Sequence, residues 1–156
     1  MKKILIALDY NPSAQKVAET GHRLAKSMNA KVVLLHVVSD FTYYSSLNYS
    51  PIMGFDSFSN AVETEGGGEL KRVALNYLER SKEHLNDETI QTTVRSGVFA
   101  KTILDTAKEL KVDIIVMGTH SRRGLEKILL GSVAEQVLHS SVIPLFIIPT
   151  RTIEEK

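Results

Sequence analysis

Apolar residues in this chain gather in short runs that do not alternate with polar ones. Such runs are typical of strands in a parallel sheet that is covered on both faces. They occupy residues 4–8, 31–39, 113–117 and 143–148. A further segment, 89–95, places Ile90, Thr92 and Val94 opposite polar neighbours. This alternation predicts a half-exposed strand at a sheet edge.

The segments between these strands carry apolar residues at helical spacing. The first such face consists of Ala14, Val17, Ala18, Gly21, Leu24, Ala25 and Met28. Asn11 and Pro12 provide a helix start, and Asn29 provides a stop. Further helices are predicted over residues 69–85, 97–110 and 133–140. Strands that alternate with helices predict an α/β fold, a doubly wound parallel sheet with helices on both faces.

The predicted organisation is a single domain over residues 1–150, followed by a polar tail at 151–156. Residues 40–68 interrupt it, because they show neither the strand period nor the helix period. They are rich in tyrosine and serine and end in the glycine triplet 66–68, which predicts a flexible hinge. A loop this long in a compact domain is usually functional or disordered. Its tyrosines suit either a lid over a ligand or packing within a dimer.

Composition excludes several classes of function. The net charge is +1 at pH 7, so the chain as a whole has no strong attraction to nucleic acid or anionic lipid. It has no cysteine, which excludes disulfides and thiol nucleophiles and suits a reducing cytoplasm. The first apolar run ends at Asp9, too early for an export signal, and no run approaches the length of a membrane span. We therefore expect a cytoplasmic protein with no nucleic-acid or membrane partner.

The stretch 117–133 has the composition of a phosphate-binding loop. It follows a predicted strand, and Gly118 and Gly131 allow a ligand to approach the main chain closely. Ser132 is expected to cap the following helix, whose N-terminal N–H groups and dipole favour an anion. Arg122 and its neighbour add positive charge. The stretch predicts a phosphate site, most simply for a nucleotide.

The last strand, Ile143 to Ile148, combines two conflicting signals. Pro144 and Pro149 indicate an edge position, because proline cannot donate a hydrogen bond to a ladder. The residues between them are apolar on both faces, and a bare apolar edge invites association. We therefore predict that a second copy pairs with this strand in a two-fold homodimer.

Gly118, Ser121 and the pair Gly131-Ser132 have the spacing of a known motif. They resemble the G-x2-G-x9-G-[S/T] nucleotide motif of the universal stress protein (UspA-type) family. The likeness extends to residues 4–9, 34–37, 131–138 and 143–149. It implies a sheet of order 3-2-1-4-5, an adenine nucleotide alpha hydrolase-like fold. It also implies a ligand at the carboxyl ends of the strands, where the order reverses.

The resemblance also assigns roles to individual residues. It implies that Ala7, Leu8 and Asp9 line the adenine and the ribose, and that Val37 packs against the base. Met117, Gly118 and His120 would approach the ribose and the α-phosphate. Gly131, Ser132 and Val133 would hold the outer phosphates through main-chain N–H groups and the Ser132 hydroxyl. The implied ligand is ATP or another adenine nucleotide, and Asp9 either helps to hold its Mg²⁺ or only caps the turn after the first strand.

The second glycine of the motif is replaced by Ser121. If this position needs a positive φ, serine costs about 1–2 kcal/mol and weakens the site. If its dihedral angles are ordinary, serine costs little and its hydroxyl bonds a phosphate. Arg122, next to Ser121, is the favoured basic contact. Among the histidines we place His120 in the site as a contact, and we interpret His36 as a core or pocket-wall residue.

The main functional hypothesis is a regulatory, stress-response protein that binds an adenine nucleotide. The nucleotide would change the conformation of the chain and so the unidentified protein partner that the homodimer engages. One alternative is a slow ATPase or autophosphorylating protein, although the sequence offers no positioned general base and no acidic cluster for two metals. The other alternative is a nucleotide-free dimeric interaction module.

Overall fold

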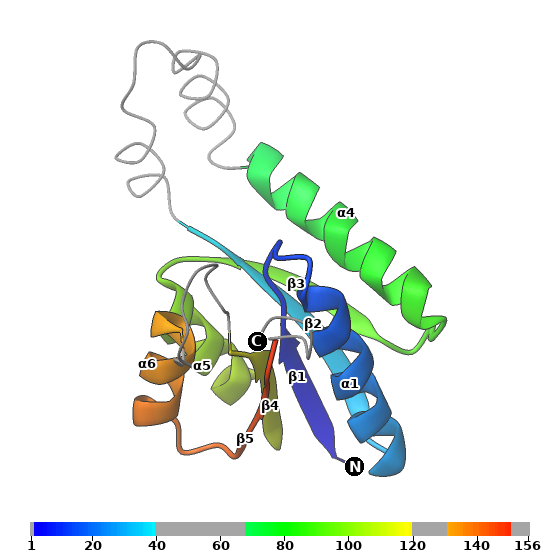
Figure 1. The fold of residues 1–156 in the computed structure, drawn as a ribbon. Coiled ribbons are helices and arrows are strands. Elements are labelled where there is room, and N and C mark those ends of the chain that lie inside the picture. The colour runs from blue at the N-terminus through cyan, green and yellow to red at the C-terminus, as the bar shows by residue number, and fades with distance from the viewer. Residues whose placement is uncertain (1, 40–67, 120–130, 151–156) are drawn as a thin grey trace, which may run out of the picture.

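The fold is an α/β domain, seen in a computed structural model that describes residues 2–39, 68–119 and 131–150. Its elements are, in chain order, β1 (Lys3–Ala7), α1 (Ala14–Ser27), β2 (Lys31–Val38), α4 (Gly68–Leu85), β3 (Gln91–Ser96), α5 (Phe99–Glu109), β4 (Ile114–Gly118), α6 (Ser132–Ser140) and β5 (Leu145–Ile148). The strands form a five-stranded sheet of order β3-β2-β1-β4-β5. All neighbours are parallel. The predicted fold class and strand order are confirmed (Figure 1).

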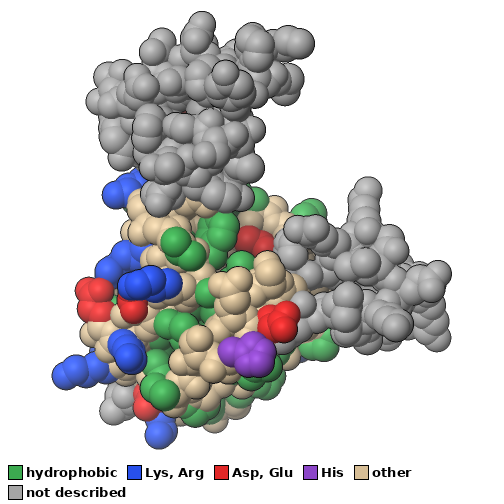
Figure 2. Space-filling model, turned by 90° about the vertical axis from the view of Figure 1, so that its left-hand side faces the viewer, with side chains coloured by type: hydrophobic (Ala, Val, Ile, Leu, Met, Phe, Trp, Pro, Cys, Tyr) green, Lys and Arg blue, Asp and Glu red, His purple; other side chains and the backbone are tan. Residues whose placement is uncertain are grey.

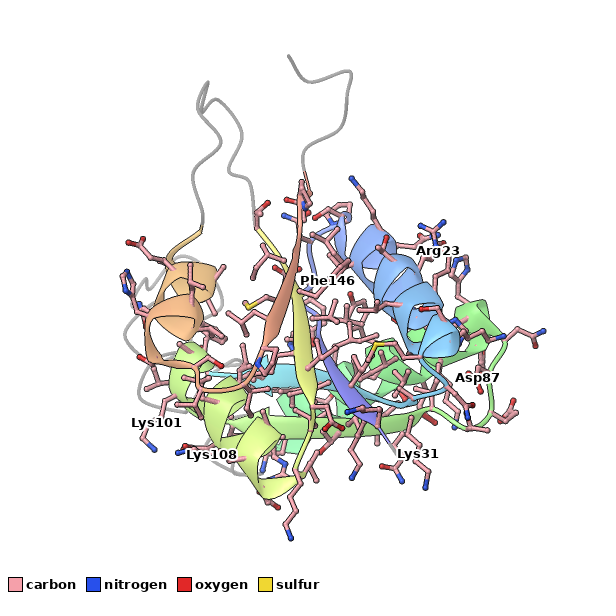
Figure 3. All side chains as sticks on the ribbon, turned by 90° about the horizontal axis from the view of Figure 1, so that it is seen from below. Arg23, Lys31, Asp87, Lys101, Lys108 and Phe146 are labelled. Atoms are coloured by element: carbon pink, nitrogen blue, oxygen red, sulfur yellow. The ribbon has the colours of Figure 1, made fainter. Side chains whose placement is uncertain are left out.

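Helices cover both faces of the sheet, as the views in Figures 1 and 3 show. The side chains of α1 and α4 share one core cluster with Ile4, Ile6 and Leu34. Those of α5 and α6 share a second cluster with Leu5 and Val33, on the opposite face. Because neighbouring residues of a strand point to opposite faces, an uninterrupted apolar run is what a strand between two helical layers requires.

The central strand β1 is enclosed by strands on both sides and by helices on both faces. Ile4, Leu5 and Ile6 have 0% relative exposure. The strand pairs with β2 through Ile6↔Leu34 and with β4 through Ile6↔Val116. Its carboxyl end therefore lies in the middle of the sheet, between two other strand ends.

The two edge strands were both predicted. The alternating segment became β3, at one edge, and the proline-bracketed run became β5, at the other. Asn29 ends α1 with a positive φ of 53°, as expected for a helix stop. Within the described ranges no helix combines the length and the apolar character needed to cross a bilayer. Residues 40–67 and 151–156, to which the predicted excursion and tail belong, lie outside the described residues.

The predicted start of α1 was wrong by a few residues. Asn11 does not cap the helix, which begins at Ala14 after the N-cap Ser13. The Asn11 side chain instead closes a turn, because its Oδ1 accepts hydrogen bonds from the Ser13 N–H at 3.0 Å and the Ser13 hydroxyl at 2.8 Å. Asparagine competes for main-chain donors in this way wherever a turn precedes a helix. Gly68, predicted as part of a hinge, is the first residue of α4.

A hydrogen-bonded histidine–carboxylate pair joins α1 to the turn after α4. His22 is buried, and its Nε2 donates to Asp87 Oδ2 at 2.8 Å. The other carboxylate oxygen of Asp87 accepts bonds from the Thr89 hydroxyl at 2.6 Å and the Thr89 N–H at 3.0 Å. The bonds from Thr89 and from His22 lower the pKa of Asp87 to about 2. In Figure 3, Asp87 lies at the end of the α1–α4 layer.

We predict that Asp87 makes the fold sensitive to acid. A carboxyl group with a lowered pKa stabilises the folded state above its unfolded value of 3.8, and this contribution is lost as the pH falls toward 2. Asp87→Asn should therefore reduce the free energy of unfolding by about 1–2 kcal/mol at pH 7. The difference from the wild type should shrink between pH 4 and pH 2. Urea unfolding across this range measures it, and a difference independent of pH would contradict the assignment.

Candidate functional site

Several predicted site residues meet at the carboxyl edge of the sheet, where the strand order reverses. Ala7 ends β1, Met117 lies near the end of β4 and Val37 near the end of β2. Their side chains belong to the same cluster on the α5–α6 face, which Val133 of α6 also joins. Where the chain leaves two neighbouring parallel strands toward opposite faces of the sheet, a crevice forms at the carboxyl ends of those strands. The structure thus brings these four residues together on one face of the sheet, at its carboxyl edge.

The N-terminus of α6 is tied to the end of β4 by one main-chain hydrogen bond. The Gly131 N–H donates to the Thr119 carbonyl at 2.8 Å. Thr119 is itself fixed, because its N–H donates to the Ile148 carbonyl at 3.0 Å. The first turn of α6 therefore lies at the same edge as Met117 and Gly118.

The helix begins one residue earlier than predicted. Gly131, not Ser132, is the N-cap of α6, and Ser132 is an exposed first-turn residue. Gly131 has φ −63° and ψ 159°, which any residue can adopt. The N–H groups of Ser132, Val133 and Ala134 have no carbonyl one turn earlier within the helix. The Gly131 N–H, by contrast, already donates to the Thr119 carbonyl. The main-chain donors that remain for a phosphate are therefore those of the residues after Gly131.

Gly118 is enclosed by the fold itself. A Cβ atom built on it would lie 2.6 Å from Thr150 Cγ2 and 2.9 Å from Val17 Cγ2. Thr150 is held there because its N–H donates to the Thr119 hydroxyl oxygen at 3.1 Å, and the two threonine hydroxyls are also 3.1 Å apart. The close approach predicted from this glycine is therefore an approach of β4 to α1 and to the chain after β5. No periodic pattern in the sequence indicates this threonine pair.

The turn after β1 is held by side chains from two other elements. The Leu8 N–H continues the ladder to the Leu35 carbonyl at 2.8 Å. The Leu8 carbonyl accepts a bond from Nδ1 of His36 at 2.8 Å, and the Asp9 carbonyl accepts one from the Tyr77 hydroxyl of α4. Asp9 is exposed, and its Oδ1 accepts the Asn11 N–H at 2.9 Å.

Three aromatic rings pack together at this turn, one from the turn itself and one each from β2 and α4. The Tyr10 ring lies 4.3 Å from that of His36 and 5.0 Å from that of Tyr77, measured between centroids. Burial lowers the pKa of His36, although the bond to Leu8 and the charge of Asp9 act in the opposite direction. Burial also raises the pKa of Tyr77 to about 12, with smaller contributions from Asp9 and Tyr10. Burial therefore favours the neutral form of His36, and the buried, hydrogen-bonded ring agrees with the predicted core residue.

Other predicted contacts cannot be placed. His120, Ser121 and Arg122 lie outside the described residues. Among the residues that the structure describes, no group of three or more His, Cys, Asp or Glu side chains is arranged to hold a metal ion.

A separate groove, with a volume of about 460 Å³, lies on the outer surface between α5 and α6. It includes none of the predicted site residues. Figure 2 shows this side of the molecule, where hydrophobic side chains are interspersed with charged ones.

Comparison with known proteins identifies relatives along almost the whole chain. The model of the universal stress protein family matches residues 1–149. Universal stress protein YxiE of Bacillus subtilis is 32% identical over 152 residues, which cover 94% of this chain and 97% of YxiE. Universal stress protein MJ0577 of Methanocaldococcus jannaschii is 31% identical over 153 residues, which cover 94% of each chain.

Solved structures show the same architecture. The structure of MJ0577 superposes with a TM-score of 0.70 and 27% identity, covering 97% of both chains. A universal stress protein in complex with cAMP superposes with a TM-score of 0.65 and covers 96% of this chain and 98% of the other. Its identity to this chain is 18%, so this likeness concerns the fold.

We predict that Gly118→Ala destabilises the protein even without any ligand. The added methyl group would overlap Thr150 and Val17, and overpacking of this kind costs about 1–3 kcal/mol. Thr150→Ser removes the nearer methyl group and keeps the hydroxyl, so it should restore part of the loss in the Gly118→Ala background. Urea unfolding of the two single variants and the double variant measures this. Wild-type stability of Gly118→Ala would show that the glycine is not required by packing.

Proposed function

The chain belongs to the universal stress protein family, and from this premise we propose that it binds an adenine nucleotide at the β1–β4 edge. Its role is regulatory and belongs to a stress response. The bound nucleotide selects one conformation of the chain, and that conformation determines which protein partner is engaged.

One observation carries this proposal, namely the position of the α6 N-terminus. The Gly131–Thr119 hydrogen bond holds the first turn of α6 at the end of β4. The main-chain donors of Ser132 and Val133 and the positive end of the helix dipole face this edge, and such a terminus favours a phosphate. The exposed Ser132 hydroxyl adds a further donor.

The remainder of the site suits the nucleoside part of the ligand. Ala7, Val37 and Met117 supply an apolar wall for a planar base on the α5–α6 face. Asp9 follows β1 at the same edge and is exposed, which supports a role for its carboxylate in accepting bonds from ribose hydroxyl groups. A Mg²⁺ ion on the phosphates would take the same carboxylate as an oxygen ligand. The solved neighbour that holds cAMP supports an adenine ligand with a phosphate.

We further propose that two copies associate through β5. This strand is a sheet edge whose outer main-chain groups face away from β4. Phe146 has 38% relative exposure although both its neighbours in the strand are partly buried. Figure 3 labels Phe146 beside β5, the strand at this edge of the sheet. A second β5 would cover this ring and complete the ladder, which removes an exposed apolar edge.

We predict that an acidic side chain at position 131 weakens nucleotide binding far more than a neutral side chain of the same shape does. Gly131→Asp and Gly131→Asn both place good N-cap residues at α6, so both should fold. The aspartate carboxylate would repel a phosphate, which at about 4 Å weakens binding tenfold or more. Isothermal titration calorimetry with Mg·ATP, ADP and AMP measures the affinities of both variants and the wild type.

The outcomes of this titration separate the three functional hypotheses. Binding by the wild type and by Gly131→Asn, with loss in Gly131→Asp, supports a phosphate at α6. Equal binding by all three places the nucleotide elsewhere. No binding by the wild type leaves the nucleotide-free interaction module, and steady conversion of ATP to ADP during the titration favours the ATPase.

We predict that Phe146→Lys converts the homodimer to a monomer. The lysine would place a charge in the centre of the paired edges, where the apolar ring is expected to be covered. Val142→Lys is the matched control, because Val142 has 85% relative exposure and lies before β5 rather than in it. Sedimentation velocity at micromolar concentrations distinguishes the two states. A wild-type monomer, or a dimer that persists in Phe146→Lys, would contradict pairing through β5.

A further inference from the structure

The main chain of Leu8 and Asp9 is fixed by two side chains that are far away in the sequence. Nδ1 of His36 on β2 bonds the Leu8 carbonyl at 2.8 Å, and the Tyr77 hydroxyl on α4 bonds the Asp9 carbonyl. A carbonyl oxygen only accepts hydrogen bonds, so Nδ1 of His36 carries the proton of the neutral ring. Each carbonyl therefore has an identified side-chain donor, and both donors come from elements outside the turn.

The hydrogen bonds made within this turn do not involve the Leu8 and Asp9 carbonyl groups. Asp9 Oδ1 accepts the Asn11 N–H, and Asn11 in turn binds Ser13. These contacts shape the chain that enters α1. The carbonyl groups of Leu8 and Asp9 are bonded instead by the side chains of His36 and Tyr77.

Ring packing makes these two donors rigid. Tyr10 lies against His36 and meets Tyr77 edge-on, with interplanar angles of 32° and 75°. Aromatic pairs favour offset and edge-to-face arrangements such as these, so the contacts stabilise the orientations of both rings. The two hydrogen bonds therefore come from an ordered cluster that joins the β1–α1 turn, β2 and α4.

We propose, on the basis of the proposed function, that His36 and Tyr77 are positioning residues of the nucleotide site. They act through the carbonyl oxygens of Leu8 and Asp9 and fix the turn that presents the Asp9 side chain to the ribose. Neither residue touches the nucleotide. Their effect on affinity arises because a preorganised turn does not lose conformational freedom when the ligand binds.

Removal of the Tyr77 hydroxyl tests one half of the proposal. Tyr77→Phe keeps the ring in place and deletes the bond to Asp9, so the dissociation constant for Mg·ATP should rise about three- to tenfold. Ser81→Ala is the matched control, because it deletes a hydroxyl bond to the Tyr77 carbonyl on the same helix, one turn away from the site. The control should bind as the wild type does. If the two variants raised the dissociation constant equally, Tyr77 would only stabilise α4, and the proposal would be overturned.

Two amide variants test the other half. The amide nitrogen of asparagine occupies the position of Nδ1 in histidine, and that of glutamine occupies the position of Nε2. His36→Asn should therefore keep the bond to Leu8 and most of the affinity, and His36→Gln should lose both. Both variants bury an amide at the same site, so circular dichroism and thermal unfolding should show similar folds. Equal affinities of the two variants would overturn the role of Nδ1.

A double-mutant cycle shows whether Tyr77 acts through Asp9. In an Asp9→Asn background, which retains an acceptor for the Asn11 N–H, Tyr77→Phe should weaken binding less than twofold. An undiminished loss would overturn the proposal. A wild type that binds no nucleotide ends the proposed function and this inference with it. A wild type that binds normally beside an unaffected Tyr77→Phe ends this inference alone.

Discussion

Burial of β1 between two parallel neighbours is the constraint on which the other features depend. Its central residues are fully enclosed, with β2 on one side and β4 on the other. The strand order reverses at the β1–β4 pair, so the helices that follow these two strands cover opposite faces: α1 one face, α6 the other. The edge between them is therefore left without a helix across it. This geometry, rather than any single side chain, determines where a ligand site can form.

The hydrogen bonds at this edge bear on the ligand that we propose. The fold satisfies the Leu8 N–H, the Gly131 N–H and the Thr119 N–H with carbonyl partners. It satisfies the carbonyls of Leu8 and Asp9 with side-chain donors. The N–H groups in the first turn of α6 have no acceptor within the helix. In the proposed function, these donors bind the phosphate, and the apolar side chains of Ala7, Val37 and Met117 contact the base.

Sequence patterns predicted the elements of this fold better than its close contacts. Buried parallel strands and the alternating edge strand have periods that a sequence displays directly, so all five strands were located from these patterns. Their order in the sheet was implied by the family resemblance and is confirmed. The helix starts shifted because Asn11 used its side chain for a turn, and because Gly131 took the cap position expected for Ser132. The role of Gly118 was interpreted from its small size alone, and only the structure shows that Thr150 and Val17 occupy the space beside it. Contacts between distant residues leave no local period.

The aromatic cluster shows why such contacts matter for the site. Tyr77 belongs to α4, whose fully buried side chains in the described core are Ala74 and Leu78. The helix is held against α1 by few apolar contacts and by polar pairs such as His84 with Glu19, at 2.7 Å, and His22 with Asp87. Any shift of α4 along the sheet moves the Tyr77 hydroxyl, and the Asp9 carbonyl must follow it or lose its partner. The conformation of the turn after β1 is therefore coupled to the position of α4, which reaches this edge through the Tyr77 hydroxyl.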